Sequence, residues 1–96
     1  MKVRYTRQAL ADLSSIADYI RQRNPVAAVS VETAIRSTIA LLADYPKIGR
    51  ERRELGARSL GIPRHPYTAY YRIEGNEVWV VHVRDDRRRP PERGDA

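Results

Sequence analysis

Histidine and arginine are the side chains of this sequence best suited to proton transfer or to chemistry on a phosphate. His65 stands between Pro63 and Pro66 and directly follows Arg64, so a titratable imidazole and a permanent positive charge share one corner of the chain. As a general acid, His65 would need a second catalytic group nearby. His82 lies in an apolar run of alternating valines, where a hydrogen-bonded histidine of a sheet is expected. The histidines alone therefore define no catalytic site.

Other common catalytic signatures are missing from the sequence. No spacing of histidines and carboxylates predicts a metal site, and there is no glycine-rich phosphate loop or G-x-S-x-G elbow. The sequence has no cysteine, which excludes disulfides and thiolate ligands and fits the reducing cytoplasm. We expect neither a metal ion nor a cofactor, and we expect a cytoplasmic protein.

The net charge of +6 comes almost entirely from arginine, which supplies 16 of the 18 basic residues. A GC-rich genome would raise the arginine content, but it would not explain the net charge. Segment 85–96 carries four arginines and four acidic residues, so the surplus lies in residues 1–84. Segment 47–64 alone holds six basic residues against two glutamates. Because arginine stays charged and binds carboxylates or phosphates in a bidentate manner, this distribution predicts an acidic protein or a nucleic acid as partner.

Two strands and a tight turn are predicted around these side chains. Residues 67–73 alternate between an apolar and a more polar face, and Gly75-Asn76 favours a hairpin turn. Residues 78–83 are apolar on both faces, which suits a central strand. Tyr70 and Tyr71 are expected on opposite faces, so that one packs in the core and the other can stack on a base or a partner. Counting alternate residues places Val78, Val80 and His82 on one face, and Trp79, Val81 and Val83 on the other. Trp79 is predicted to be a core residue.

The preceding chain predicts two helices. Thr6 is a good N-cap for a helix over residues 7–23, and Asn24-Pro25 starts a second helix whose apolar period continues to Leu42. Residues 2–5 and 57–62 are further strand candidates, and residues 50–56 are predicted to be a charged connection. The expected fold is an α+β domain of order β-α-α-β-β-β, with a helical hairpin on one face of a small, mainly antiparallel sheet.

At 96 residues the sequence has room for one domain, which we place at residues 1–84, followed by a charged, flexible tail at 85–96. No apolar run approaches the length of a membrane span, and the first residues lack the apolar segment of a signal peptide.

The ordered features resemble a known family of toxins. The β-α-α-β-β-β order, the helix ADLSSIADYIRQRNP, the helix end YPKIGRERRELG and the final hairpin are similar to toxins of type II toxin-antitoxin modules, the RelE/ParE superfamily. The likeness covers roughly residues 2–90. The YP-x-IGR segment, the R-x-L strand and the Y-x-x-Y-Y-R strand look closer to the ParE branch than to the RelE branch.

The resemblance implies a toxin that is held inactive by a cognate antitoxin, which wraps a helix and an extended segment around it. ParE-like toxins inhibit DNA gyrase, so we expect a protein inhibitor without chemistry of its own, in a hetero-oligomer with its antitoxin. The acidic antitoxin would lay its helix across an apolar groove between the helical hairpin and the sheet. The expected antitoxin contacts are Arg50, Arg52, Arg53 and Arg58, and the expected gyrase contacts are Arg84, Arg87 and Arg88.

Two alternatives remain at this point. RelE-like toxins cut messenger RNA on the ribosome, and in that case Arg64, His65, Arg72 and Arg84 would supply the phosphate and proton groups. RelE-like nucleases tend to carry His or Tyr after the last strand, where this chain has Asp85-Asp86, and two carboxylates would repel a scissile phosphate. ParE-like chains often have a His near the same point, so the Asp pair departs from that pattern too. The other alternative, a plain basic RNA- or DNA-binding domain, lacks the aromatic strand pattern of an RNA-recognition motif.

Overall fold

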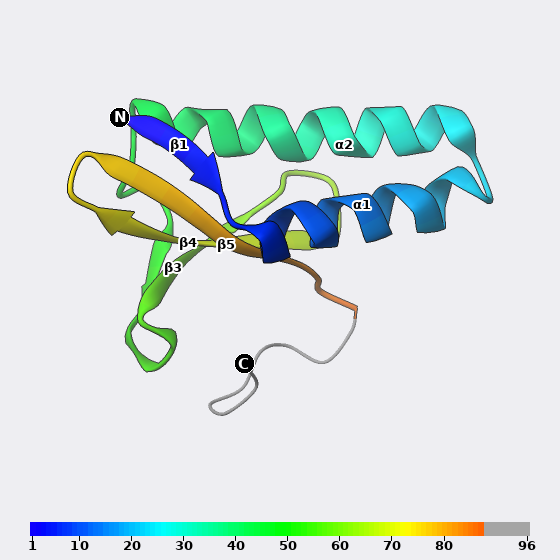
Figure 1. The fold of residues 1–96 in the computed structure, drawn as a ribbon. Coiled ribbons are helices and arrows are strands. Elements are labelled where there is room, and N and C mark those ends of the chain that lie inside the picture. Colours follow the sequence, from blue (N-terminus) through cyan, green and yellow to red (C-terminus); the bar gives the residue numbers. More distant parts are fainter. Residues whose placement is uncertain (88–96) are drawn as a thin grey trace.

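Two helices cover one face of a five-stranded sheet in the computed structural model, which describes residues 1–87 (Figure 1). The strands lie in the order β1-β5-β4-β3-β2, with β1 parallel to β5 and all other neighbours antiparallel. This confirms the predicted α+β fold and the helical hairpin on a mainly antiparallel sheet. The elements are β1 (Lys2–Tyr5), α1 (Arg7–Arg21), α2 (Pro25–Ala40), the 3-10 helix η1 (Leu41–Ala43), β2 (Arg50–Arg52), the 3-10 helix η2 (Arg53–Leu55), β3 (Ala57–Gly61), β4 (Tyr67–Glu74) and β5 (Glu77–Asp85).

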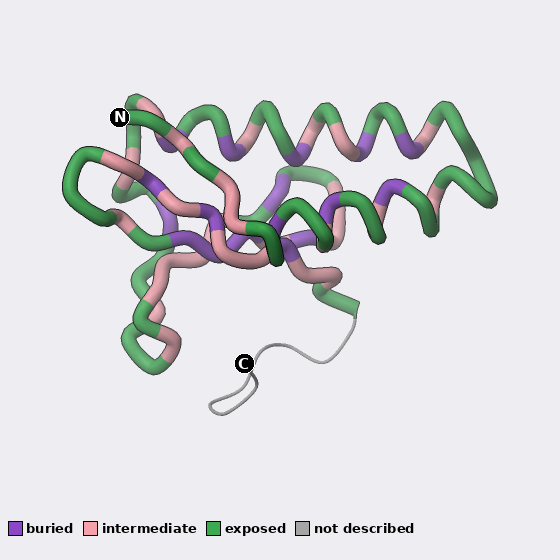
Figure 2. The backbone as a smooth tube through the Cα atoms, viewed as in Figure 1, coloured by how far each residue is buried: buried purple, intermediate pink, exposed green. Residues whose placement is uncertain are grey.

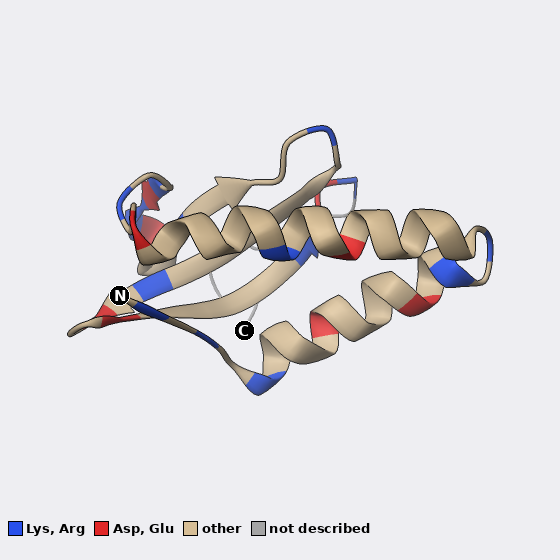
Figure 3. Ribbon diagram, turned by 90° about the horizontal axis from the view of Figure 1, so that it is seen from above, with Lys and Arg blue, Asp and Glu red and all other residues tan. Residues whose placement is uncertain are grey.

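Side-chain caps start both helices at the predicted residues. Thr6 Oγ1 accepts a hydrogen bond from the Ala9 N–H at 3.1 Å, and Asn24 Oδ1 accepts one from the Ala27 N–H at 3.1 Å. α1 ends at Arg21, two residues before the predicted end, because the chain already turns there toward Asn24. The helices run antiparallel, and α2 lies above the sheet while α1 lies along the side where β1 and β5 run (Figures 1 and 3).

Strand β2 was not predicted, because its residues were assigned to a connection. Arg50, Glu51 and Arg52 pair with Ser59, Arg58 and Ala57 of β3. A short run of three charged residues carries no apolar alternation, so the pattern gives no strand signal. Charged residues on a short outer strand also discourage pairing with another chain.

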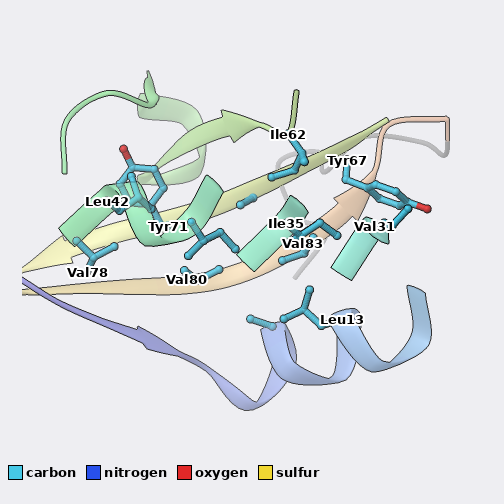
Figure 4. Packing of buried hydrophobic residues seen from close by; sticks show 13 residues of the cluster. Leu13, Val31, Ile35, Leu42, Ile62, Tyr67, Tyr71, Val78, Val80 and Val83 are labelled. Atoms are coloured by element: carbon cyan, nitrogen blue, oxygen red, sulfur yellow. The ribbon is translucent and has the colours of Figure 1, made fainter. Parts of the chain in front are cut away.

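The core lies between α2 and the sheet, with α1 closing one side. The side chains of Ile35, Ile39 and Leu42 are fully buried, as are Tyr71 and Val80 of the sheet. Figure 2 shows the buried positions of α2 on its side toward α1 and the sheet, and Figure 4 shows the side chains that meet in the core. Burying these apolar groups supplies the main driving force that holds the helical hairpin on the sheet.

A β-bulge reverses the predicted faces in the second half of β5. Tyr70 pairs with His82, but Tyr71 pairs with Val80, so Val81 is the extra residue. The extra residue returns Val83 to the core face, where it is 2% exposed. The prediction that grouped His82 with the core valines by alternation was therefore wrong, since alternation assumes an unbroken ladder.

Trp79 is half-buried and lies outside the buried core, which corrects its expected core position. Its neighbours in the ladder are Arg4 and Arg72, on the face that no helix covers. Tyr71 points into the core and Tyr70 to the opposite face, as the pattern predicted, although Tyr70 is also buried there.

Residues Pro25–Ala43 form the one helical segment of the described chain that is long and apolar enough to cross a membrane, by length and composition only. Glu32 and Arg36 interrupt its apolar sequence, which is why the sequence predicted no apolar run of this length. A core helix passes the same test, and Ile35 and Ile39 of this segment are fully buried against the sheet.

Candidate functional site

The face of the sheet that the helices leave uncovered carries arginines from every strand except β3. Side chains of residues paired across neighbouring strands project from the same face. The pairing places Arg4, Trp79 and Arg72 in one row, Arg50, Ser59, Tyr70 and His82 in a second, and Gly61, Thr68 and Arg84 in a third. We call this surface the open face of the sheet.

Carboxylates at the margins neutralise part of the open face. Arg4 binds Glu77, and the guanidinium of Arg52 lies 2.6 Å from Glu54. A third pair joins Arg72 to Glu74 at 3.6 Å, while within residues 1–87 Arg50 and Arg84 make no ion pair. Arg50 of β2 and Arg84 of β5 are therefore the arginines of this face that no carboxylate pairs within residues 1–87.

The pKa shifts follow these contacts. The hydrogen bond from Arg4 lowers the pKa of Glu77 below its ordinary value. The pKa of Glu54 is lowered by a backbone hydrogen bond and then by the hydrogen bond from Arg52. Both carboxylates therefore stay ionised at neutral pH, where they contact Arg4 and Arg52.

A groove of about 170 Å³ lies between α1 and the end of β5. β1 pairs only with residues 77–80, so the second half of β5 has β4 on one side and no strand on the other. Asp12 of α1 takes the place of a strand partner, because its Oδ2 accepts a hydrogen bond from the Val83 N–H at 2.9 Å and lies 3.3 Å from His82 Nδ1. The groove is lined by Asp12, Ser15, Ile16, Tyr19, Val83, Arg84 and Asp85.

The carboxylates at the end of β5 are bound to their own chain. Asp85 binds the guanidinium of Arg87 through both oxygens, at 3.0 and 2.8 Å. Asp86 Oδ1 accepts a hydrogen bond from the Thr68 hydroxyl at 2.6 Å, and its N–H donates to the Pro66 carbonyl at 2.7 Å. This arrangement continues the folded part of the chain past residue 84, the predicted end of the domain.

The turn between η1 and β2 is attached to the sheet by two side chains. The Tyr71 hydroxyl accepts from the Gly49 N–H at 2.9 Å and donates to the Pro46 carbonyl at 2.7 Å. Arg58 Nη1 donates to the Gly49 carbonyl at 2.9 Å. Figure 4 shows the Tyr71 ring beside Leu42, with the hydroxyl pointing away from the middle of the core. Tyr71 and Arg58 therefore fix the backbone conformation of this turn.

The predicted nuclease residues are spread over the open face and one corner. Arg72 and Arg84 share the open face, but Thr68, the partner of Arg84, lies four residues from Arg72, or roughly 13 Å along the strand. Arg64 is exposed in the turn before β4, with a positive φ of 69°, and His65 follows it there. The fold gathers no compact acid–base set from these four residues.

The residues predicted to contact a partner also lie on different surfaces of the protein. Arg50 and Arg52 project from the open face, whereas Arg58 pairs with Glu51 and Tyr71 on the opposite face and its guanidinium binds backbone carbonyls. Arg53 is highly exposed, with 89% of its side chain accessible. Of the predicted target contacts, Arg84 lies on the open face, Arg87 is bound by Asp85, and Arg88 lies outside the described residues.

Sequence reasoning did not find the groove beside α1 or the role of Asp12. The hydrogen bond between Asp12 and Val83 joins residues 71 positions apart, and neither an aspartate nor a valine by itself predicts such a contact. His82 was predicted to be a hydrogen-bonded sheet histidine, and its ring nitrogen does lie beside Asp12. Within residues 1–87 no group of three or more His, Cys, Asp and Glu side chains forms a cluster able to hold a metal ion.

The comparison with protein families decides the assignment. The model of the ParE toxin of the type II toxin-antitoxin system parDE matches residues 3–90 of this chain. The chain belongs to the ParE toxin family. The resemblance to the RelE/ParE superfamily is thereby confirmed, and membership of this family implies an antitoxin as partner of the toxin.

Several known toxins are similar to this ParE-family toxin over most of their length. Toxin RelE2 of Caulobacter vibrioides is 34% identical over 86% of this chain and 92% of its own. Putative toxin Y4kP of Sinorhizobium fredii is 38% identical over 85% of this chain and 84% of its own. The solved chain from the chromosomal ParDE toxin-antitoxin system of P. aeruginosa is 28% identical with a TM-score of 0.77, covering 86% of this chain and 92% of that one.

Proposed function

We propose that this ParE-family toxin is a protein inhibitor of DNA gyrase that an acidic cognate antitoxin neutralises in the cytoplasm. The choice of gyrase follows the likeness to the ParE branch. The supporting observation lies at the end of β5, where Asp85 and Asp86 stand in place of a histidine or tyrosine and are hydrogen-bonded to their own chain. Carboxylates at this place oppose a scissile phosphate, whereas an inhibitor that blocks a partner has no need to bind one there.

Arg84 is the proposed contact to the gyrase–DNA complex, because it lies on the open face and makes no ion pair within residues 1–87. A supercoiling assay with purified toxin tests the proposal. Wild-type toxin is expected to stop supercoiling or to trap cleaved DNA, and Arg84→Ala to require roughly tenfold more toxin for the same effect. Arg21→Ala on α1 is the matched control. Unaltered gyrase activity at high toxin concentration, with no trapped DNA, would exclude the gyrase proposal.

The acidic antitoxin is proposed to contact Arg50, Arg52 and Arg53. Arg58 is not included, because its guanidinium is bound to the Gly49 carbonyl of the 45–49 turn. Reversing these three charges to glutamate is expected to weaken the complex by roughly a hundredfold, since like charges then face each other. A variant with the same change in net charge on another surface separates local contact from overall attraction. That control changes Arg7, Arg21 and Arg23, which are exposed residues in or next to α1, to glutamate. If the two triple variants bind the antitoxin with equal affinity, the proposal that the antitoxin contacts Arg50, Arg52 and Arg53 is wrong.

A ribosome-dependent messenger RNA nuclease is the second candidate, because Arg72 and Arg84 share one open face and one relative is named Toxin RelE2. Primer extension on transcripts after toxin induction tests it. Cuts at codon positions that disappear in Arg72→Ala and Arg84→Ala variants would favour the nuclease. Intact transcripts in cells whose growth has stopped would exclude it.

A further inference from the structure

We propose that the turn at residues 45–49 is a preformed docking site for apolar side chains of an acidic segment of the antitoxin. This inference rests on the proposed function, since it needs an acidic antitoxin. It adds to that function a second anchor point, distinct from the arginines of β2 and from the groove beside α1.

Three large apolar side chains are exposed around this turn. Leu41, Tyr45 and Ile48 are 47%, 61% and 46% exposed. Backbone hydrogen bonds connect them in sequence, because the Tyr45 N–H donates to the Leu41 carbonyl at 2.9 Å and the Ile48 N–H donates to the Tyr45 carbonyl at 3.2 Å. Single exposed apolar residues are ordinary, but three at one fixed bend form a candidate contact surface.

The bend is held in one conformation. The Tyr71 hydroxyl bonds both Pro46 and Gly49, and Arg58 bonds the Gly49 carbonyl. A Cβ atom at Gly49 would lie 2.5 Å from the Tyr71 hydroxyl, so the backbone approaches the tyrosine as closely as only glycine permits. A partner that binds here does not have to order the loop, which removes part of the entropic cost of association.

The positive charges next to the turn favour an acidic partner. Residues 41–54 carry Lys47, Arg50, Arg52 and Arg53 against Asp44, Glu51 and Glu54. Arg52 and Arg53 are paired with Glu54 and Glu51, so within residues 1–87 the cations without an ion pair are Lys47 and Arg50. A second copy of this chain would bring two such positive segments together and would be repelled. An acidic segment with aliphatic or aromatic anchors matches both the apolar turn and the positive residues beside it, so the antitoxin is the occupant we assign.

Serine substitutions at Tyr45 and Ile48 test the docking site. The probe is the full-length product of the reading frame that adjoins this gene, titrated against purified toxin by calorimetry. Each substitution is expected to weaken binding roughly tenfold, as for an anchor residue at an interface. Val26→Ser and Val29→Ser are the matched controls, because these valines are 80% and 67% exposed on α2, away from the turn. The controls should stay within about twofold of wild type.

Hydroxyl-radical footprinting of the wild-type complex gives a second readout that needs no variant. Tyr45 and Ile48 should become protected when the probe binds, while Val26 and Val29 keep their reactivity. Unchanged affinity of both turn variants, or unprotected Tyr45 in the complex, overturns the inference. So does a turn variant that alters self-association of the free toxin and leaves probe binding intact, because the occupant is then a second copy. Failure of wild-type toxin to bind the probe overturns the antitoxin proposal itself and this inference with it.

Discussion

The carboxylate of Asp12 accepts the backbone N–H of Val83 at 2.9 Å, and this bond attaches α1 to the free edge of β5. The same oxygen lies 3.3 Å from His82 Nδ1. Thr6 extends the attachment, because its hydroxyl donates to the Val81 carbonyl at 3.2 Å. α1 therefore satisfies backbone groups that β1 leaves unpaired, and it protects this edge of the sheet from pairing with another chain.

Replacing Asp12 with alanine should lower the free energy of unfolding by about 1–3 kcal/mol, because the N–H of the buried Val83 then lacks its acceptor. Asp12→Asn keeps an acceptor oxygen and should cost less. Urea denaturation of the two variants measures the difference. Asp18→Ala, at an exposed position on the same helix, is the control and should change stability little. Equal stability of Asp12→Ala and wild type would show that the bond does not contribute.

The Tyr71 hydroxyl should contribute about 1–3 kcal/mol to stability, because it bonds two backbone groups of the 45–49 turn. Tyr71→Phe keeps the packing of the ring and removes both bonds. Tyr45→Phe removes an exposed hydroxyl and serves as the control. Thermal unfolding followed by circular dichroism compares them, and equal melting temperatures would contradict the proposed attachment of the turn.

Gly49→Ala should destabilise the fold by about 1–3 kcal/mol through crowding, because its Cβ would meet the Tyr71 ring and lie 2.9 Å from the Ser59 carbonyl oxygen. Gly61→Ala is a matched control. A Cβ at Gly61 meets no atom within 4 Å, so alanine there should be neutral or slightly stabilising. Chemical denaturation of both variants tests the difference. A Gly49 variant as stable as the Gly61 variant would mean that the turn is not tightly held.

Stability should fall at alkaline pH. Burial raises the pKa values of Tyr5, Tyr67 and Tyr71 above the ordinary value of 10.0. Above pH 10 the unfolded chain loses these phenolic protons while the folded chain retains them, so the stability present below pH 10 declines as the pH rises. Urea unfolding from pH 8 to 11 measures this decline. Tyr71→Phe should show a shallower slope, and an identical slope would exclude Tyr71 as a source.

The helices were predictable because their signals are local. The caps at Thr6 and Asn24 and the apolar period of three and four residues act within a few positions of the chain. The hairpin of β4 and β5 was predictable for the same reason, since an alternating run and a run rich in valine flank a turn at Gly75. The family assignment also needed only the order of these features and their motifs.

The arrangement of the candidate site required the tertiary structure. Arg50 and Arg58 belong to one basic stretch of sequence, yet the pairing of β2 with β3 sends them to opposite faces of the sheet. The bulge at Val81 likewise decided that Val83, rather than His82, joins the core. Composition and local pattern determined a basic α+β fold with two capped helices and a final hairpin, and the resemblance to the RelE/ParE superfamily indicated a toxin. Which arginines face a partner was decided by strand register, because register depends on contacts between residues far apart in the chain.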